Sequence, residues 1–172
     1  MSVPDNWLWR EEPLSGGRTV VFDIDGVLAN ADDRQHLITG SRRDWKNFFG
    51  ACGDDAPIEE THRLLELLSP ETVVVLLTGR PVEVQQLTVD WFDRHGLRWD
   101  LLIMRNKGDY DAALIFKQQT VRKLKQLGFE LRLAFEDDAD NHQMFQDEGV
   151  PCIYMHSGYY ETRDAMRKQQ EA

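Results

Sequence analysis

Cysteine is scarce in this 172-residue sequence, which contains only Cys52 and Cys152. Two thiols at this separation form no metal-binding cluster and provide no disulfide framework. Long apolar runs are also missing, since none approaches the ~20 residues that a membrane-spanning helix needs. The first residues, MSVPDNWLWREEP, lack the charged and then apolar pattern of a secretion signal. We therefore expect a cytoplasmic protein without a membrane partner.

Basic residues are outnumbered in the sequence. There are 20 lysines and arginines against 30 aspartates and glutamates, which gives a formal net charge of −10. This balance argues against a broad, non-specific grip on nucleic acid, but it leaves room for a local basic site. A phosphate-binding loop of the form G-x-x-x-x-G-K-S/T is absent as well. We therefore expect no kinase domain in this chain.

The residues that are present favour one soluble α/β domain spanning residues 1–172, because 41% of them are hydrophobic and no linker divides the chain. Short runs rich in β-forming residues alternate with amphipathic helical patterns. Such alternation predicts a three-layer fold with a mostly parallel sheet. The five predicted strands are Thr19–Ile24, Thr72–Leu77, Asp100–Met104, Leu131–Phe135 and Pro151–Met155.

Two aspartates follow the first of these strands at once, in the stretch VVFDIDGVLAN. Residues two apart in a strand face the same side. If the strand stops near Phe22, the carboxylates of Asp23 and Asp25 lie close together at its carboxyl end. Their mutual repulsion is unfavourable unless a cation or a shared proton relieves it.

Other polar groups are predicted at the same edge of the sheet. Residues 78–80 (Thr-Gly-Arg) follow the second strand, and residues 136–138 (Glu-Asp-Asp) follow the fourth. Lys117 falls on the apolar stripe of a predicted helix, near its start, so its amine should reach the rim of the sheet. In parallel sheets, ligands bind at the carboxyl ends of the strands. Acidic groups, a hydroxyl, backbone donors and a lysine suit a phosphoryl site with Mg²⁺.

The chemistry that this set of residues predicts uses the two aspartates differently. Asp23 can act as a nucleophile on phosphorus once a metal ion and Lys117 screen its charge. Asp25 can protonate the leaving oxygen and then activate water.

The stretches FDIDGVLA, LLTGR and FEDD, together with Lys117, resemble the four motifs of the haloacid dehalogenase superfamily of phosphatases in order and spacing. The resemblance implies a Rossmann-like sheet, one Mg²⁺ ion, Asp23 as nucleophile and Asp25 as acid and base. It also implies phosphate contacts from Thr78, Gly79 and Lys117. The metal ion would be held by Asp23, the main-chain carbonyl of Asp25 and an acid of FEDD.

A closer resemblance is to the 3′-phosphatase domain of phage-type polynucleotide kinase/phosphatases. It rests on Arg34, eleven residues after the nucleophile, on the pair Asp44-Trp45, and on the stretches WFDRHGLRWDLLIMRNKGDY and MFQDEGVPCIYMHSGYY. It implies that Arg34 and Arg80 contact substrate phosphate. Matching FEDDADNHQMF to the family's two-acid motif places its second and third residues on the two acids, and we predict the later one, Asp137, as the direct metal ligand. Glu136 or Asp138 would then act through water.

A small cap insertion is predicted after the first strand, over approximately residues 30–56. Its aromatic residues Trp45, Phe48 and Phe49 either stack on a base of the substrate or pack the cap onto the domain. Packing is the preferred interpretation at this point.

The sequence thus predicts a Mg²⁺-dependent phosphomonoesterase with an aspartyl-phosphate intermediate on Asp23. The expected substrate is a phosphomonoester, either a 3′-phosphate at a nucleic-acid end or a nucleotide. One alternative is a phosphatase of mononucleotides or small metabolites, which the net negative charge favours. The other is a catalytically silent binding module of the same fold, but the retention of Asp23, Asp25, Lys117 and the acidic motif speaks against it.

Overall fold

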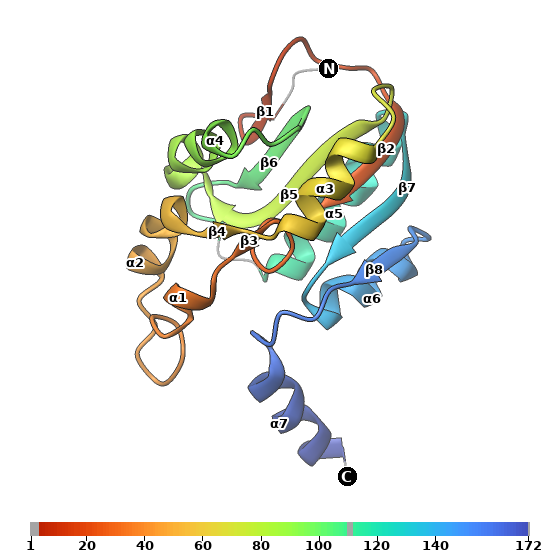
Figure 1. Ribbon diagram of the computed structural model, residues 1–172. Coiled ribbons are helices and arrows are strands. Elements are labelled where there is room, and N and C mark those ends of the chain that lie inside the picture. The colour runs from red at the N-terminus through yellow and green to blue at the C-terminus, as the bar shows by residue number, and fades with distance from the viewer. Residues whose placement is uncertain (1–3, 110–111, 172) are drawn as a thin grey trace.

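The computed structural model describes residues 4–109 and 112–171 and has the predicted three-layer α/β architecture (Figure 1). Tyr110, which ends one of the family-like stretches, lies outside the described residues, as do the first three residues and the last. All five predicted strands are present and form a parallel array. They are β2 (Gly17–Phe22), β5 (Val73–Pro81), β6 (Leu101–Arg105), β7 (Phe129–Glu136) and β8 (Cys152–Tyr154).

The sheet has a sixth strand that the sequence analysis missed. Strand β1 (Trp7–Trp9) pairs antiparallel with β6, so the strand order is β1-β6-β5-β2-β7-β8. We expected five strands because a three-residue segment is too short to show strand periodicity. Trp7 pairs with Ile103 and is buried in the core, so this segment covers one edge of the sheet.

Four helices cover the two faces of the sheet. Helices α3 (Glu59–Leu67) and α4 (Gln85–Arg94) contribute side chains to one hydrophobic cluster, and α5 (Ala113–Gln126) and α6 (Ala139–Asp147) contribute to the other. A 3₁₀ turn, η2 (Val82–Val84), precedes α4 and follows Pro81, whose backbone is still extended.

Because successive side chains of a strand point to opposite faces of the sheet, a buried strand contributes residues to both hydrophobic clusters. In β5, Val74 and Leu76 belong to the α3–α4 side, whereas Val73, Val75 and Leu77 belong to the α5–α6 side. A strand that is buried on both faces is hydrophobic at every position, as the run VVVLL is.

The segment after β2 leaves the sheet and returns to it through a small two-stranded sheet, β3–β4. Its helices lie near the edge at which the parallel strands end, and the C-terminal helix α7 also lies beyond this edge (Figure 1). The elements of this part of the structure are β3 (Ala29–Asn30), α1 (Asp32–Gln35), α2 (Trp45–Gly50), η1 (Cys52–Asp54), β4 (Ala56–Pro57) and α7 (Glu161–Glu171).

Strand β2 lies where the direction of chain winding changes. Its neighbours are β5 on one side and β7 on the other, and the crevice at such a point is the usual ligand site of an open α/β sheet. Phe22 is level with Leu76 of β5 and with Phe135 of β7. The rings of Phe22 and Phe135 stack with their centroids 4.6 Å apart, so the ends of β2 and β7 pack against each other.

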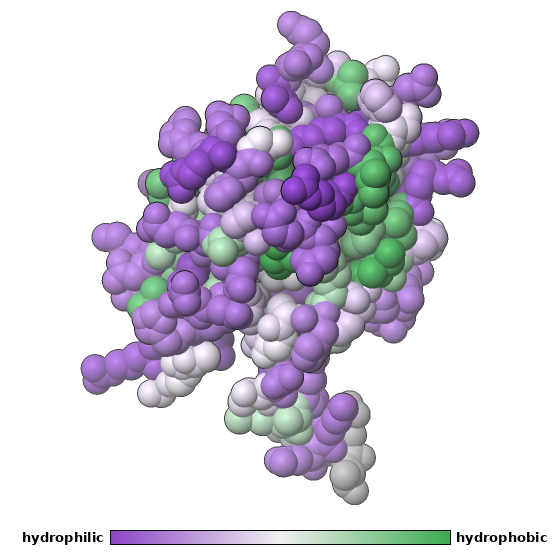
Figure 2. All heavy atoms as spheres, viewed as in Figure 1, coloured by the Kyte–Doolittle hydropathy of each residue, from purple (hydrophilic) through white to green (hydrophobic). Residues whose placement is uncertain are grey.

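The surface is dominated by hydrophilic residues in the view of Figure 2, with a strip of hydrophobic residues over the region of β7 and β8. Ile153 of β8 is among the exposed apolar side chains. Within the described part of the chain, no helix has the length and apolar character required to cross a bilayer.

The burial of the sheet on both faces predicts that substitutions of two leucines differ in their effect on the free energy of unfolding. Leu76 in the central sheet is fully buried, whereas Leu67 on α3 is 82% exposed. Replacing Leu76 by alanine should lower the free energy of unfolding by about 2–5 kcal/mol, because it removes buried methyl groups and leaves a cavity. The matched change Leu67→Ala should alter it by less than about 0.5 kcal/mol. Urea unfolding measures both, and equal losses would show that the sheet is not the core.

Candidate active site

A pocket of about 240 Å³ opens at the carboxyl edge of the sheet. Five of the predicted site residues line it: Asp23, Asp25, Thr78, Gly79 and Lys117. The other three predicted residues, Arg34, Arg80 and Asp137, are buried, and they are not among the described residues that line the pocket. The predicted residues therefore gather in one region, where five of them line the pocket and the other three are buried.

Three acidic side chains meet at the ends of β2 and β7. Carboxylate oxygens of Asp23, Glu136 and Asp137 lie within 4.8 Å of one another, and all three residues are buried. Burial raises the pKa of Asp23 to about 7; the neighbouring Glu136 acts in the same direction, whereas Lys117 opposes the shift. Burial also raises the pKa of Asp137, and Asp23 and Glu136 add to that shift. The cluster is therefore short of positive charge.

Asp137 is the residue of this cluster that lacks partners. Neither of its buried carboxylate oxygens accepts a hydrogen bond of ordinary geometry from the described residues. The hydroxyl of Ser157 lies near enough to favour the ionised form, but its geometry does not meet that of a hydrogen bond. An unsatisfied buried carboxylate is rare in folded proteins and calls for an ion or water. The residues present therefore fit a hard cation such as Mg²⁺.

The chain reaches this arrangement through a glycine at position 26. Gly26 has a positive φ of 80°, and a Cβ atom built there would lie 2.2 Å from Oδ2 of Asp137. Both the backbone conformation and the close approach require glycine. The glycine that follows the two aspartates in the sequence thus lets the acid of β7 come close to the end of β2.

Lys117 supplies the positive charge within this cluster. It projects from α5, is nearly completely buried, and places Nζ 2.7 Å from Glu136 Oε2 and 3.1 Å from Asp23 Oδ1. Burial disfavours its charge, but the two carboxylates outweigh this effect and raise the pKa of Lys117. The predicted placement of this lysine toward the sheet agrees with its contacts.

Glu136 and Asp138 have different hydrogen-bond partners. Glu136 accepts the hydrogen bond of Lys117, and its other oxygen accepts from the backbone N–H groups of the next two residues at 3.2 Å. Asp138 caps α6 by accepting from the N–H of Asp140, and both of its oxygens bind Arg163, at 2.7 and 2.9 Å. Among the described residues, Asp138 is therefore already satisfied and is not part of the acidic cluster.

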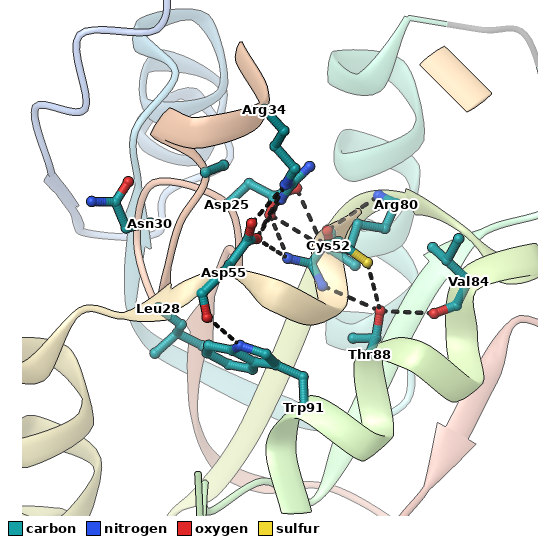
Figure 3. Close-up of polar contacts among 12 residues, drawn as sticks. Asp25, Leu28, Asn30, Arg34, Cys52, Asp55, Arg80, Val84, Thr88 and Trp91 are labelled. Carbon is teal, nitrogen blue, oxygen red and sulfur yellow. Dashed lines mark hydrogen bonds and ion pairs between the residues drawn. The ribbon is translucent and has the colours of Figure 1, made fainter. Parts of the chain in front are cut away.

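Asp25 belongs to a second ionic cluster, in which charges are matched (Figure 3). Its Oδ1 lies 2.5 Å from Nη2 of Arg34 and 2.6 Å from Nη2 of Arg80. Burial disfavours the ionised form of Asp25, but the two guanidinium groups outweigh it and hold its pKa below the ordinary value. The side chain of Asp25 is thus ionised at neutral pH in this arrangement.

The arginines are themselves held by Asp55, a residue that the sequence analysis missed. Asp55 Oδ2 lies 2.6 Å from Arg34 and 3.2 Å from Arg80, and its backbone oxygen accepts from Trp91 Nε1 at 2.8 Å (Figure 3). In the sequence it is one of two adjacent aspartates in GDDAP, and nothing there separates it from the exposed Asp54. Only the fold shows which of them is buried.

Thr78 and Gly79 form the side of the pocket next to Asp23. They lie inside β5, in the irregular stretch between Leu77 and Pro81, rather than after its end as predicted. The hydroxyl of Thr78 accepts the backbone N–H of Arg80 at 3.2 Å, which leaves its proton available to a ligand. A Cβ atom at Gly79 would meet only Ala113, at 3.9 Å, so the fold itself does not require this glycine.

Two tyrosines near the C-terminus also line the pocket and were not predicted. The hydroxyl of Tyr159 accepts the N–H of Ala31 at 2.8 Å, so it joins the C-terminal segment to the segment after β2. Tyr160 lies under the guanidinium of Arg163, which is 4.5 Å from its ring centre. Both tyrosines end the family-like stretch MFQDEGVPCIYMHSGYY, but the resemblance assigned them no role in the site.

The matched cluster predicts that Asp55 is essential for stability. Asp55→Asn removes one charge that two buried arginines share, and we expect a loss of about 3 kcal/mol in the free energy of unfolding. The matched control is Asp54→Asn, at the exposed neighbouring position, with an expected change below about 0.5 kcal/mol. Urea unfolding distinguishes the two, and equal stability of both variants would show that Asp55 does not hold the arginines.

The comparisons with known proteins agree with this geometry. The model of the polynucleotide kinase PNKP phosphatase-domain family matches residues 17–160. No curated protein matches the chain.

Solved structures share the fold at low sequence identity. A chain of the Pnkp1/Rnl/Hen1 RNA repair complex superposes with a TM-score of 0.68 at 22% identity, over 87% of this chain and 45% of that chain. A haloacid dehalogenase superfamily hydrolase from Geobacter sulfurreducens gives 0.53 at 12% identity, over 80% and 86% of the two chains. A haloacid dehalogenase-like hydrolase from Streptococcus pneumoniae gives 0.51 at 13% identity, over 81% and 84%.

The present chain spans less than half the length of the chain from the repair complex, so that match concerns one part of a larger protein. The family match, in contrast, covers most of the present chain, including every predicted site residue. The chain therefore belongs to the family of polynucleotide kinase PNKP phosphatase domains.

Proposed function

We propose that this protein is a Mg²⁺-dependent phosphomonoesterase that forms a covalent aspartyl-phosphate (acyl phosphate) intermediate on Asp23. The observation that carries the proposal is the acidic cluster beneath the pocket. Asp23 lies on the pocket wall with Lys117 3.1 Å away and with Asp137 and Glu136 within 4.8 Å. A buried carboxylate beside a fixed ammonium and a cation-binding acid is suited to attack on a phosphorus atom.

Asp23 and Asp137 are the side chains that we assign to the metal ion, with the main-chain carbonyl of Asp25 as a third protein ligand. The support is the pair of unsatisfied oxygens on Asp137. Glu136 accepts from Lys117 and from two backbone N–H groups, so we assign it an outer role that orients the lysine and the metal-binding acids. Bound Mg²⁺ would neutralise carboxylate and phosphate oxygens at this point.

The phosphoryl group of the substrate is bound by three groups on the pocket wall. We assign the hydroxyl of Thr78, the backbone N–H groups around Gly79 and the amine of Lys117 to its oxygens. A carboxylate oxygen of Asp23 then forms a bond to phosphorus as the bond to the leaving oxygen breaks. Water subsequently attacks the same phosphorus, and its bond to Asp23 breaks to release inorganic phosphate.

Asp25 transfers the protons in this scheme. Protonated Asp25 gives its proton to the leaving oxygen in the first step, and the resulting carboxylate takes one from the attacking water in the second, which restores the protonated form for the next turnover. Because the arginines favour the carboxylate, the first step requires that Asp25 has taken up a proton beforehand. Arg34 and Arg80 hold its carboxylate in place and lower its pKa, so the form that accepts a proton from water predominates at neutral pH. A direct phosphate contact by either arginine, which the family resemblance implies, would require one of these bonds to be exchanged for a phosphate oxygen.

We propose a 3′-phosphate at a nucleic-acid end as the substrate. The support is membership of the PNKP phosphatase-domain family and the likeness to part of a chain in an RNA repair complex. We further propose a single phosphatase domain in which residues 30–56 form a cap. In support of that role, residues of this segment, including Gln35, Ile38 and Trp45, line the pocket beside Asp23.

Free mononucleotides are the second candidate substrate class. The formal net charge of −10 favours them, because a polyanionic strand is repelled by an acidic protein more strongly than a single nucleotide is. The two classes differ in the rest of the substrate and not in the chemistry at phosphorus.

The test is the release of inorganic phosphate, in the presence of Mg²⁺, from a 3′-phosphorylated oligonucleotide and from 3′- and 5′-mononucleotides. We expect turnover of the oligonucleotide with the highest kcat/KM, and we expect Asp23→Asn to lower kcat by roughly 10³-fold or more because it removes the nucleophile. Circular dichroism of the variant checks that its fold is kept.

Turnover of mononucleotides alone would assign the protein to the second class. An Asp23→Asn variant that is folded and still releases phosphate at the normal rate would overturn the covalent mechanism. No turnover of any of these substrates by the wild-type protein would overturn the proposed function as a whole.

A further inference from the structure

A large aromatic side chain on the pocket wall has no task in the chemistry described above. Trp45 is the first residue of α2 and lines the same pocket as Asp23 and Thr78. Its exposed fraction is 46%, whereas the neighbouring Phe48 is 5% exposed. Packing of the segment therefore accounts for Phe48 but leaves nearly half of the indole surface open to the pocket and to solvent.

The indole is held in a fixed orientation despite this exposure. Its ring stacks on Phe49 with a centroid distance of 5.8 Å and an angle of 22°, and it meets the edge of Phe48 at 5.7 Å. Asp44 caps the helix directly before it by accepting from the N–H and the side-chain amide of Asn47, at 3.1 and 2.6 Å. A flat surface that is supported from behind is suited to stacking, because little side-chain freedom is lost when a second ring covers it.

The position of Trp45 is also linked to the reacting groups. Phe48, which the indole contacts, lies under the guanidinium of Arg34, whose central carbon is 4.3 Å from the ring centre. The backbone oxygen of Phe48 accepts from Arg34 at 3.3 Å, and Arg34 in turn binds Asp25. The exposed indole is therefore connected to the proton-transferring carboxylate through the buried Phe48 and Arg34.

The chemistry of the surroundings favours an uncharged ring as the ligand of this surface. The protein has a formal net charge of −10, so it can gain little affinity for a nucleotide strand from charge alone. Base stacking on an aromatic side chain contributes to binding without a contact to phosphate, and it tolerates any base. The pocket, at about 240 Å³, adjoins the indole, so a group larger than the phosphate fits beside it.

We infer that Trp45 is a specificity-determining residue that stacks on the nucleobase of the nucleotide bearing the scissile phosphate. The inference rests on the proposed function and deepens it, because it makes the terminal base part of the recognised substrate. It assigns Phe49 and Phe48 to the support of the indole. It also separates the task of binding the base from the task of binding phosphate, which belongs to Thr78 and Lys117.

The test compares two 3′-phosphorylated oligonucleotides of the same sequence, one with a base on the terminal sugar and one in which that base is replaced by hydrogen. For wild-type protein, we expect a KM that is about 5- to 100-fold lower for the substrate with the base, the range typical of one stacked base. In Trp45→Ala this preference should shrink to less than about 3-fold, and Trp45→Phe should restore most of it. Exchanging the base among A, C, G and T should change KM by less than removing it.

Leu67→Ala serves as the control, because Leu67 is an exposed apolar residue on α3 that does not line the pocket. It should keep the wild-type preference. Equal KM values of the wild-type protein for the two oligonucleotides would overturn the inference while leaving the proposed function intact. A Trp45→Ala variant that retains the full preference would do the same. If wild-type protein hydrolyses neither oligonucleotide, the proposed function fails, and the inference fails with it.

Discussion

The arrangement of the site depends on an unbalanced charge at the carboxyl edge of the sheet. Asp23, Glu136 and Asp137 bring three carboxylates together in a buried cluster, and Lys117 provides one ammonium group. When all are ionised, the cluster has a formal charge of −2, and burial opposes that charge by raising the pKa values of the two aspartates. A divalent cation matches this deficit in both sign and size. The stacked rings of Phe22 and Phe135 and the conformation of Gly26 serve to bring the strand ends close enough for the cluster to form.

A balanced cluster next to it shows the contrast. Asp25 and Asp55 are two carboxylates that face two guanidinium groups, those of Arg34 and Arg80, with contacts between 2.5 and 3.2 Å. Here the charges cancel without any ion, and the pKa of Asp25 is lowered rather than raised. The two aspartates of the DID sequence are thus separated electrostatically: one lies beside a cation-binding group, and the other is neutralised by arginines. This difference supports the proposal that they perform different steps.

The sequence predicts which residues gather at the sheet edge better than it predicts the residues that support them. The alternation of strands and helices and the acids after VVF and LRLAF depend on local patterns, and these identify the sheet edge, Asp23, Asp25 and Lys117. Strand β1 was missed because it is three residues long and is stabilised by pairing with β6, over 90 residues later. The burial of Asp55 was missed for the same reason, since its partners Arg34 and Arg80 are distant in sequence. The exposure of Trp45 likewise depends on how its segment folds back and could not be read from composition.

The measurement that tests the unbalanced cluster most directly is the free energy of unfolding with and without Mg²⁺, at an ionic strength matched with NaCl so that screening is the same. The account predicts that Mg²⁺ raises this free energy, by about 2.7 kcal/mol when the ion is present at 100 times its dissociation constant. It predicts that Asp137→Asn removes most of this rise and that Asp140→Asn, at a partly exposed position on α6, keeps it. An unfolding free energy that is the same with and without Mg²⁺ would contradict the claim that a cation completes the site.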